Sequence, residues 1–237
     1  METFFSQNIT DGLIILDNLE SRHCIKVLRK VVGDHINIVD GKGNLYKGKI
    51  ISTDRNNCKV QITNILNKYG DNGYYIHIGI ACIKNHDRLE WFVEKSVEIG
   101  VDEISFLHCD RSIKKTIKNN RISNVAITAM KQSGKAKLPI INDLVNFKDF
   151  TENCKSHNKF ICHLYNKDKK NIFFYKENMK KNKDNCILIG PEGDFTISEI
   201  KLAGKYNFKS ITIGDSCLRT ETAGVVACHL LNLVNTL

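Results

Sequence analysis

Two glycine-containing segments near the end of the chain have the residue types and spacing of a ligand-binding site. The apolar run Ile187–Ile189 stops at Gly190-Pro191-Glu192-Gly193, and the apolar run Ile211–Ile213 stops at Gly214. Short apolar runs bounded in this way predict buried strands that end in tight loops. Glycines there let main-chain N–H and C=O groups approach a flat ligand. In a parallel sheet, loops at the carboxyl ends of neighbouring strands line one crevice, where ligands bind.

Two ionisable residues follow the second glycine loop and could act on a reacting group. Arg219 stands at the predicted start of the last helix, where the helix dipole disfavours a positive charge. This position favours a functional cation over a structural ion pair. Glu221 suits the first turn of a helix already, so a structural role is the simpler interpretation for it. Thr220 or Thr222 is expected to cap the helix.

Strands that alternate with helices from residue 74 onward predict an α/β domain with a parallel sheet. Before the two runs named above, strands are predicted at 75–83, 103–109 and 160–165. The lysine-rich segment 166–185 has weak periodicity and is predicted to be a surface excursion.

Three further helices are predicted between these strands. Asp87 and Glu90 are expected to cap a helix that ends at Gly100. Its apolar stripe is predicted to consist of Leu89, Phe92, Val93 and Val97. A long helix is predicted within 119–133, and Thr196, the first residue of a capping box, predicts the start of another.

Residues 1–70 are predicted to be mainly strands that form a small β-barrel. Segments 12–17, 35–40 and 58–63 alternate or run apolar between turn residues. One helix interrupts them, and its apolar face is predicted to consist of Leu19, Cys24, Ile25 and Leu28. Residues 67–73 are rich in turn formers and predict a linker, so the domains are expected at 1–70 and 74–237.

The charge distribution favours a polyanionic partner. The chain of 237 residues has a formal net charge of +9. Between residues 111 and 137 it has eight basic residues and no Asp or Glu. These are Arg111, Lys114, Lys115, Lys118, Arg121, Lys131, Lys135 and Lys137. A solvated helix face usually mixes signs, so this stretch favours phosphate contact over an idle basic surface.

Other features exclude several classes of protein. No apolar run has the roughly 18 residues of a membrane span, and the first residues lack the order of a signal peptide. The nine scattered cysteines suit reduced thiols in a cytoplasmic protein. Four adjacent His–Cys pairs lack the spacing of a zinc site, so no metal is expected.

The two glycine segments also carry a family resemblance. Ile189-Gly-Pro-Glu-Gly193 followed by Leu218-Arg-Thr-Glu-Thr-Ala223 resembles the signature of the RsmE ribosomal RNA methyltransferases, of the SPOUT class. Segments 23–34, 110–112 and 131–139 resemble further blocks of that family. The resemblance runs from about residue 20 to the end, and it is weakest at 40–75 and 140–185.

The resemblance implies an S-adenosylmethionine-dependent enzyme that methylates N3 of a specific uridine in 16S ribosomal RNA of the small subunit. It implies a homodimer, a C-terminal SPOUT-type parallel sheet with a deep trefoil knot, and an N-terminal PUA-like RNA-binding β-barrel. Methylating a base nitrogen that carries a proton requires loss of that proton and stabilisation of an anion. Arg219 is therefore expected to stabilise the negative charge, and Glu221 or solvent to accept the proton.

The resemblance also implies two sets of binding residues. The cofactor-binding residues are expected to be Leu164, Ile189, Gly190, Glu192, Gly193, Ile213, Gly214, Cys217 and Leu218. The RNA-binding residues are expected to be Arg22, His23, Arg29, Arg111, Ser112, Lys131, Gln132 and Lys135.

Three positions depart from the family pattern. Asp194 stands where many relatives have a second glycine; a side chain there can restrict the loop, although Asp tolerates unusual backbone angles. Lys135 and Ser216 stand where the family often has Arg, which removes a bidentate donor at the first position and a cation at the second.

Two other classes of function remain open. A non-catalytic RNA-binding protein would explain the barrel and the charge but not the two glycine loops. Another nucleotide-dependent enzyme is compatible with a parallel sheet. The chain lacks a phosphate-binding Gly-x-x-x-x-Gly-Lys-Ser/Thr loop and a Gly-x-Gly-x-x-Gly turn after a strand.

Overall fold

The chain forms two units in the computed structural model, which describes residues 2–54, 56–113, 116–165, 169–181 and 183–237. The first unit contains the residues up to Asn72 together with Ile127–Leu138, and the second contains Gly73–Ala126 and Pro139–Leu237. Lys114 and Lys115 of the basic stretch lie outside the described residues.

The first unit is a six-stranded sheet in the order β1-β4-β5-β6-β3-β2. Its strands are β1 (Thr3–Phe5), β2 (Ile9–Thr10), β3 (Leu13–Ile15), β4 (His35–Val39), β5 (Leu45–Ser52) and β6 (Lys59–Leu66). β1 pairs with β4 in parallel, and the other neighbours pair antiparallel. Alternate residues of β4, β5 and β6, including Ile38, Ile50 and Val60, are completely buried. The three predicted strand segments are confirmed, whereas β5 was not predicted.

The predicted N-terminal helix is shorter and wider than its sequence pattern indicated. The α-helix α1 (Asn18–Arg22) continues as the π-helical turn η1 (His23–Val27), in which Leu28 N–H donates to His23 O. Cys24 is buried as predicted, but Leu19 is 77% exposed, so its place on the apolar face was wrong. A π turn closes over five residues instead of four. An apolar face predicted from the α-helical period is therefore assigned to the wrong residues around such a turn.

The second unit is a seven-stranded, fully parallel sheet in the order β11-β13-β10-β12-β7-β8-β9. Its strands are β7 (Tyr75–Ala81), β8 (Glu103–His108), β9 (Ile140–Asn146), β10 (Asn158–Cys162), β11 (Lys170–Asn171), β12 (Asp184–Ile189) and β13 (Lys209–Thr212). The predicted α/β class with a parallel sheet is therefore confirmed. β9 and β11 were not predicted.

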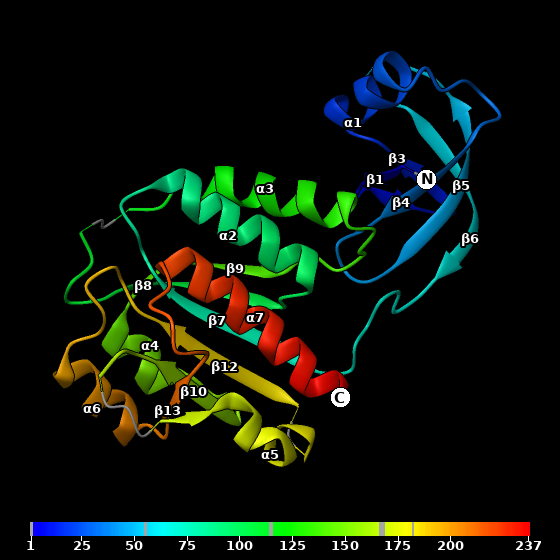
Figure 1. The fold of residues 1–237 in the computed structure, drawn as a ribbon. Coiled ribbons are helices and arrows are strands. Elements are labelled where there is room, and N and C mark those ends of the chain that lie inside the picture. The colour runs from blue at the N-terminus through cyan, green and yellow to red at the C-terminus, as the bar shows by residue number, and fades with distance from the viewer. Residues whose placement is uncertain (1, 55, 114–115, 166–168, 182) are drawn as a thin grey trace. The chain divides into compact units, whose positions relative to one another are not determined.

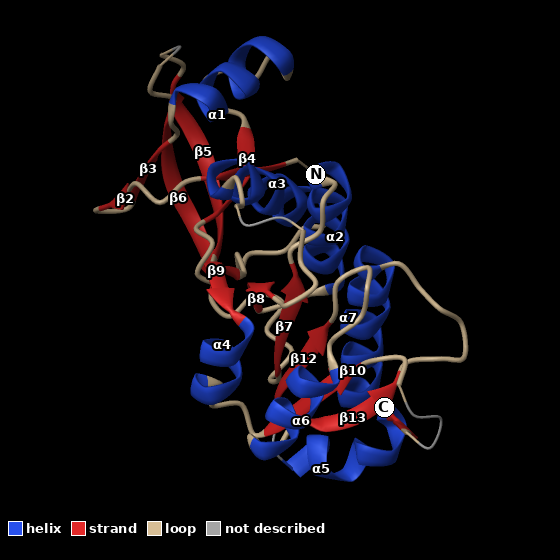
Figure 2. Cartoon of the chain, turned by 90° about the vertical axis from the view of Figure 1, so that its left-hand side faces the viewer, coloured by secondary structure: helices blue, strands red, loops and turns tan. Residues whose placement is uncertain are grey.

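Helices cover both faces of this sheet (Figures 1 and 2). The helices of the chain after β7 are α2 (His86–Ile99), α3 (Asn119–Gln132), α4 (Phe147–Asn153), α5 (Lys176–Lys181), α6 (Ile197–Lys205) and α7 (Thr220–Thr236). α2 and α7 lie on one face, and α4 and α6 lie on the other. Packing is close where glycine permits it, since a Cβ at Gly224 of α7 would meet Phe92 of α2 at 2.6 Å.

The predicted helix after β7 is confirmed, with a different cap. Leu89, Phe92, Val93 and Val97 are at most 1% exposed. The helix ends at Gly100, which has the left-handed φ of 119° typical of a C-cap. Asn85 caps the start, because its side chain accepts the N–H groups of Asp87 and Arg88. Asp87 and Glu90, the predicted caps, form ion pairs with Arg121 instead.

The described part of the lysine-rich segment before β12 forms regular structure, not the predicted surface excursion. Residues 166–168 and 182 lie outside the described residues, and the rest forms β11, the 3-10 helix η2 (Ile172–Tyr175) and α5. Ile172 and Met179 are completely buried. Because lysines separate these few apolar residues, the sequence pattern did not predict that they are buried.

Candidate functional site

Three loops at the carboxyl ends of parallel strands line a cavity of about 630 Å³. They are the β10 loop (residues 163–165), the β12 loop (residues 190–196) and the β13 loop (residues 213–219). The prediction that two glycine loops share one crevice is confirmed. The prediction that their strands are neighbours was wrong, because β10 lies between β12 and β13. The order of the strands within a sheet cannot be predicted from the hydrophobic pattern of the sequence.

The glycine loops are held by hydrogen bonds from two threonine side chains. Gly214 has a φ of 149°, and a Cβ there would meet no atom within 4 Å. Thr212 bonds both the N–H and the C=O of Gly214, which closes the turn. The buried Thr220 hydroxyl donates to Gly190 O at 2.9 Å and joins the start of α7 to the β12 loop. The tight turn at Gly214 thus borders open space.

The start of α7 differs from the predicted cap. Arg219 is the N-cap residue, and no side chain accepts a hydrogen bond from the first turn. Thr220 does not cap the helix, because its hydroxyl is used by Gly190. The capping box predicted at Thr196 is present, with Glu199 as its partner.

Eight of the nine predicted cofactor-binding residues line the cavity. These are Leu164, Ile189, Gly190, Glu192, Ile213, Gly214, Cys217 and Leu218. Gly193 is outside the lining, and its carbonyl accepts a hydrogen bond from Arg111 Nη1 at 2.5 Å. The prediction did not include Cys162, His163 and Lys169. These residues line the cavity because β10 lies between β12 and β13.

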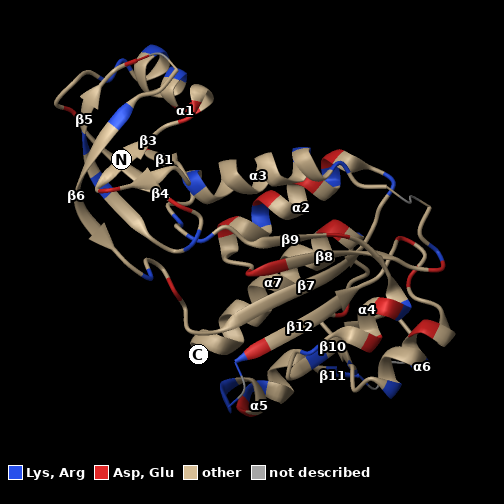
Figure 3. Cartoon of the chain, turned by 180° about the vertical axis from the view of Figure 1, so that it is seen from behind, with Lys and Arg blue, Asp and Glu red and all other residues tan. Residues whose placement is uncertain are grey.

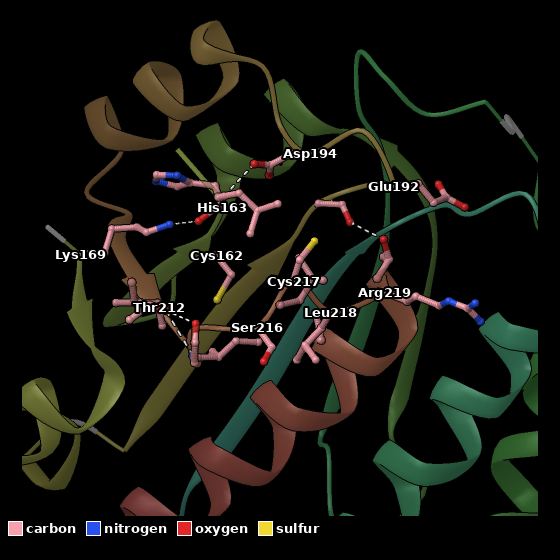
Figure 4. Close-up of a pocket in the computed structure, with 18 of the residues that line it drawn as sticks. Cys162, His163, Lys169, Glu192, Asp194, Thr212, Ser216, Cys217, Leu218 and Arg219 are labelled. Carbon is pink, nitrogen blue, oxygen red and sulfur yellow. Dashed lines mark hydrogen bonds between the residues drawn. The ribbon is translucent and has the colours of Figure 1, made fainter. Parts of the chain in front are cut away.

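The two residues predicted to be catalytic lie in different surroundings. Arg219 is exposed and lines the cavity, and Figure 4 shows it extending away from Cys162 and Thr212, toward the side where Glu192 lies. Glu221 is buried, is not part of the lining, and lies 3.7 Å from Arg88 Nε. Arg219 and Glu192 are therefore among the residues that line the cavity, and Glu221 is not.

Three titratable side chains from β10 and the residues after it line the cavity. Burial lowers the pKa of His163, whose Nε2 lies 2.8 Å from Ser210 Oγ, and burial also lowers the pKa of Lys169. Burial raises the pKa of the Cys162 thiol to about 12, so it stays protonated and is a poor nucleophile. The β12 and β13 loops add Glu192, Asp194, Asp215 and Arg219 to the lining.

The predicted RNA-binding residues divide between the two units. Arg22, His23, Arg29, Lys131, Gln132 and Lys135 belong to the first unit, and Arg111 and Ser112 belong to the second. Figure 3 shows Lys and Arg along α1 and β5 of the first unit. Two cations of the basic stretch have acidic partners, because Lys131 pairs with Glu20 and Arg121 with Glu90. The stretch is thus less one-sided in the fold than in the sequence.

Arg111 and Ser112 lie beside the cavity in the loop after β8. Arg111 Nη1 donates to Gly193 O and, at 3.2 Å, to the hydroxyl of Tyr165. Ser112 Oγ accepts the N–H of Cys109 and tightens this loop. A predicted RNA contact therefore touches the β12 loop directly.

A second cavity of about 740 Å³ is lined by residues of β7, β8 and β9, by the first residue of β12, and by α4 and the residues after it. Buried His77 has Nε2 2.8 Å from Ser105 Oγ and Nδ1 3.5 Å from Glu103 Oε2. Asn142 donates to Glu103 at 2.6 Å and to Ser105 at 2.8 Å, and the Tyr75 hydroxyl donates to Glu103 at 2.9 Å. Burial lowers the pKa of His77 and raises that of Tyr75.

Every helix in the described part of the chain is too short or too polar to cross a lipid bilayer. The same residues contain no group of three or more His, Cys, Asp or Glu placed to hold a metal ion. The nine cysteines, all of them described, form no disulfide.

Comparison with known proteins identifies the family. Residues 71–232 match the model of the RNA methyltransferase domain, and residues 16–63 match that of the RNA methyltransferase PUA domain. Ribosomal RNA small subunit methyltransferase E of Buchnera aphidicola is 32% identical over 225 residues, which are 90% of this chain and 85% of the relative.

Solved structures agree with this assignment. A probable rRNA-methyltransferase from Porphyromonas gingivalis superposes with a TM-score of 0.88 at 32% identity, covering 100% of this chain and 99% of the other. A methyltransferase from Legionella pneumophila with the bound cofactor SAM has a TM-score of 0.86 at 26% identity, covering 98% and 97%. The chain therefore belongs to the RNA methyltransferase family, among the relatives of ribosomal RNA small subunit methyltransferase E.

Proposed function

We propose that this protein transfers a methyl group from S-adenosylmethionine to N3 of a specific uridine in 16S ribosomal RNA of the small ribosomal subunit. The observation that carries the proposal is the cavity formed by the β10, β12 and β13 loops within the matched methyltransferase domain. The N-terminal match to a PUA domain of RNA methyltransferases supports RNA as the substrate.

The residues of the cavity fit this cofactor. Its volume of about 630 Å³ lies within the usual range for a site that holds a small molecule or cofactor. Main-chain groups at Ile189, Gly190, Ile213 and Leu218 would hold the adenosine, and Gly214 would leave room beside it because it has no side chain. When bound, the cofactor supplies a methyl group activated by a positively charged sulfonium. The carboxylates that line the cavity favour a ligand with that charge.

Arg219 is proposed to stabilise the anion that develops on the uracil ring when its N3 proton is lost. The backbone of Arg219 stands at the N-cap of α7, and its guanidinium would donate hydrogen bonds to the charge as it forms. Glu192 or solvent is the proposed proton acceptor, since Glu192 lines the cavity. Glu221 is proposed to hold the start of α7 through Arg88.

The finer architecture is also part of the proposal. The first unit would act as a PUA-like RNA-binding barrel at 1–70, and residues 74–237 would form a SPOUT domain whose cofactor loops are knotted. Residues 127–138, which belong to the first unit, would extend the RNA-binding surface with Lys131, Gln132 and Lys135. Two copies would form a cytoplasmic homodimer, so that the barrel of one copy presents RNA to the cavity of the other.

Methyl transfer to ribosomal particles tests the proposal. The protein is incubated with methyl-labelled S-adenosylmethionine and with small subunits from cells that lack the corresponding methyltransferase. Because N3 lies on the pairing edge of uracil, methylation there stops reverse transcription and locates the modified base. We expect one stop in 16S RNA. Label at another atom, or none despite cofactor binding, would contradict the proposed reaction.

A further inference from the structure

Asp194 links two loops of the cofactor cavity through its side chain. Its carboxylate Oδ2 accepts the main-chain N–H of Leu164 at 2.7 Å, and its Oδ1 accepts the N–H of Phe195 at 2.8 Å. Leu164 belongs to the β10 loop and Asp194 to the β12 loop, and both line the cavity. Figure 4 shows the first bond as a dashed line from Asp194.

The backbone at Asp194 is in an unusual conformation. Its φ is 61°, in the left-handed region that costs a non-glycine residue on the order of 1 kcal/mol. Such residues persist where the surrounding structure determines them. Here the two carboxylate hydrogen bonds are charge-assisted, which makes them stronger than neutral ones. The side chain thus offsets the backbone cost at the position where many relatives are expected to have glycine.

Neighbours hold the β12 loop on both sides of Asp194. Arg111 donates to Gly193 O, and the Asp110 carboxylate accepts the Thr196 hydroxyl at 3.0 Å. The main-chain N–H of Asp110 also donates to Glu199 at 2.9 Å. The β12 loop is therefore a fixed support from which the Asp194 side chain reaches the β10 loop.

In the β10 loop, by contrast, His163 is buried with its Nε2 2.8 Å from Ser210 Oγ, but the two residues after it have little apolar anchorage. Leu164 is 63% exposed and Tyr165 39% exposed, so the hydrophobic core does not fix them. Besides the bond from Leu164 N–H to Asp194, the Tyr165 hydroxyl accepts one from Arg111. Loss of the Asp194 carboxylate would leave the main chain at Leu164 without its partner at the cavity wall.

We infer that Asp194 is a positioning residue that sets the shape of the cofactor site by holding the β10 loop against the β12 loop. The inference rests on the proposed function. It assigns the carboxylate a mechanical role, distinct from direct attraction of the positive sulfonium. The two roles differ in their effect on S-adenosylhomocysteine, the product, which has the same adenosine but no sulfonium charge.

Calorimetric titration of both ligands into the full chain tests this. Asp194→Gly permits the same backbone angle and deletes the carboxylate, and we expect it to weaken both ligands by about tenfold, equal to about 1.4 kcal/mol. The KM for S-adenosylmethionine rises by a similar factor, while kcat at saturating cofactor stays within about twofold. Asp11→Gly is the matched control, because Asp11 is exposed in the first unit with a φ of 48°. It leaves both affinities unchanged.

Several outcomes would overturn the inference. One is an Asp194→Gly variant that binds both ligands like the wild type, and another is loss of affinity for S-adenosylmethionine alone. If that variant does not fold, Asp194→Asn carries the comparison. It keeps one oxygen acceptor and should weaken both ligands equally, by about threefold; unchanged affinities would again overturn it. Failure of the wild type to bind either ligand would instead remove the proposed function.

Discussion

The two ends of the parallel sheet carry cavities of similar size but different construction. At the carboxyl ends, the cavity of about 630 Å³ is bordered by loop main chain and by exposed charged side chains. At the amino ends, the cavity of about 740 Å³ is bordered by side chains from within the strands, which bond one another. The first exposes the charged side chains of Glu192 and Arg219 to a ligand, and the second uses its polar side chains in bonds with one another.

This difference separates a site for chemistry from a site for stability. A network that satisfies its own buried groups stabilises the sheet, and removing one member leaves the others without partners. A cavity with a main-chain border gains stability only when a ligand binds. Substitutions at the carboxyl ends should therefore change activity and cofactor affinity, and those at the amino ends should change the free energy of unfolding.

The largest expected effect is that of Arg219→Ala. Removing a preorganised donor to a developing anion typically lowers kcat by about 10²–10³-fold. Because Arg219 extends away from the inner part of the cavity, cofactor affinity should stay within about threefold of the wild type. Single-turnover methyl transfer and calorimetry measure the two quantities. Undiminished turnover would remove Arg219 from the reaction.

Next in size is the effect of Ser105→Ala on stability. The substitution leaves His77 Nε2 and Asn142 Nδ2 each short of a bond in a buried network, and should lower the free energy of unfolding by about 1–3 kcal/mol. Ser96→Ala is the matched control, because the completely buried Ser96 Oγ has no hydrogen-bond partner among the described residues. Denaturant unfolding should show little loss for it. Equal losses for both variants would show that the network adds no stability.

Much of the carboxyl-end site was predictable from the sequence. Ile187–Ile189 and Ile211–Ile213 are apolar runs stopped by glycine, and that pattern is sufficient to place two loops at one edge of a parallel sheet. The contribution of His163 and Lys169 was not predictable, since nothing in the hydrophobic pattern places β10 between β12 and β13.

The amino-end network was not predicted at all. Its members alternate with apolar residues along β7 and β8, as in Tyr75-Ile76-His77, and such residues read as ordinary strand positions. Their hydrogen bonds join residues 28 to 39 positions apart. Likewise, Glu221 looked like a candidate proton acceptor until the fold placed it against Arg88 of α2. The role of such a side chain depends on which distant residue it contacts in the fold, and a single sequence does not show those contacts.

A smaller effect is expected for Gly214→Ala. With a φ of 149°, Gly214 adopts a conformation that is strained for alanine by about 1 kcal/mol, and relaxation would move the β13 loop. Affinity for S-adenosylmethionine should fall by about tenfold or less. Gly70→Ala is the control, because Gly70 also has a positive φ, of 75°, with open space around it in the first unit. It should destabilise the protein similarly and leave cofactor affinity unchanged, whereas equal affinity losses would mean a general effect of strain.

The smallest effect concerns pH and again separates the two ends. Burial depresses the pKa of His77 below its ordinary value of 6.5, so the unfolded chain binds a proton more readily than the folded one. Stability should therefore fall as the pH drops below about 6.5, with a slope of at most about 1.4 kcal/mol per pH unit for one histidine. His77→Gln should flatten the slope of unfolding free energy between pH 7 and 5 in the free protein. Saturating S-adenosylmethionine should leave this slope unchanged, because the ligand is proposed to bind at the other end of the sheet. The contrary outcome is a slope that the ligand removes and that His77→Gln leaves intact. It would assign the titration to His163 of the cofactor cavity, because burial also lowers the pKa of His163.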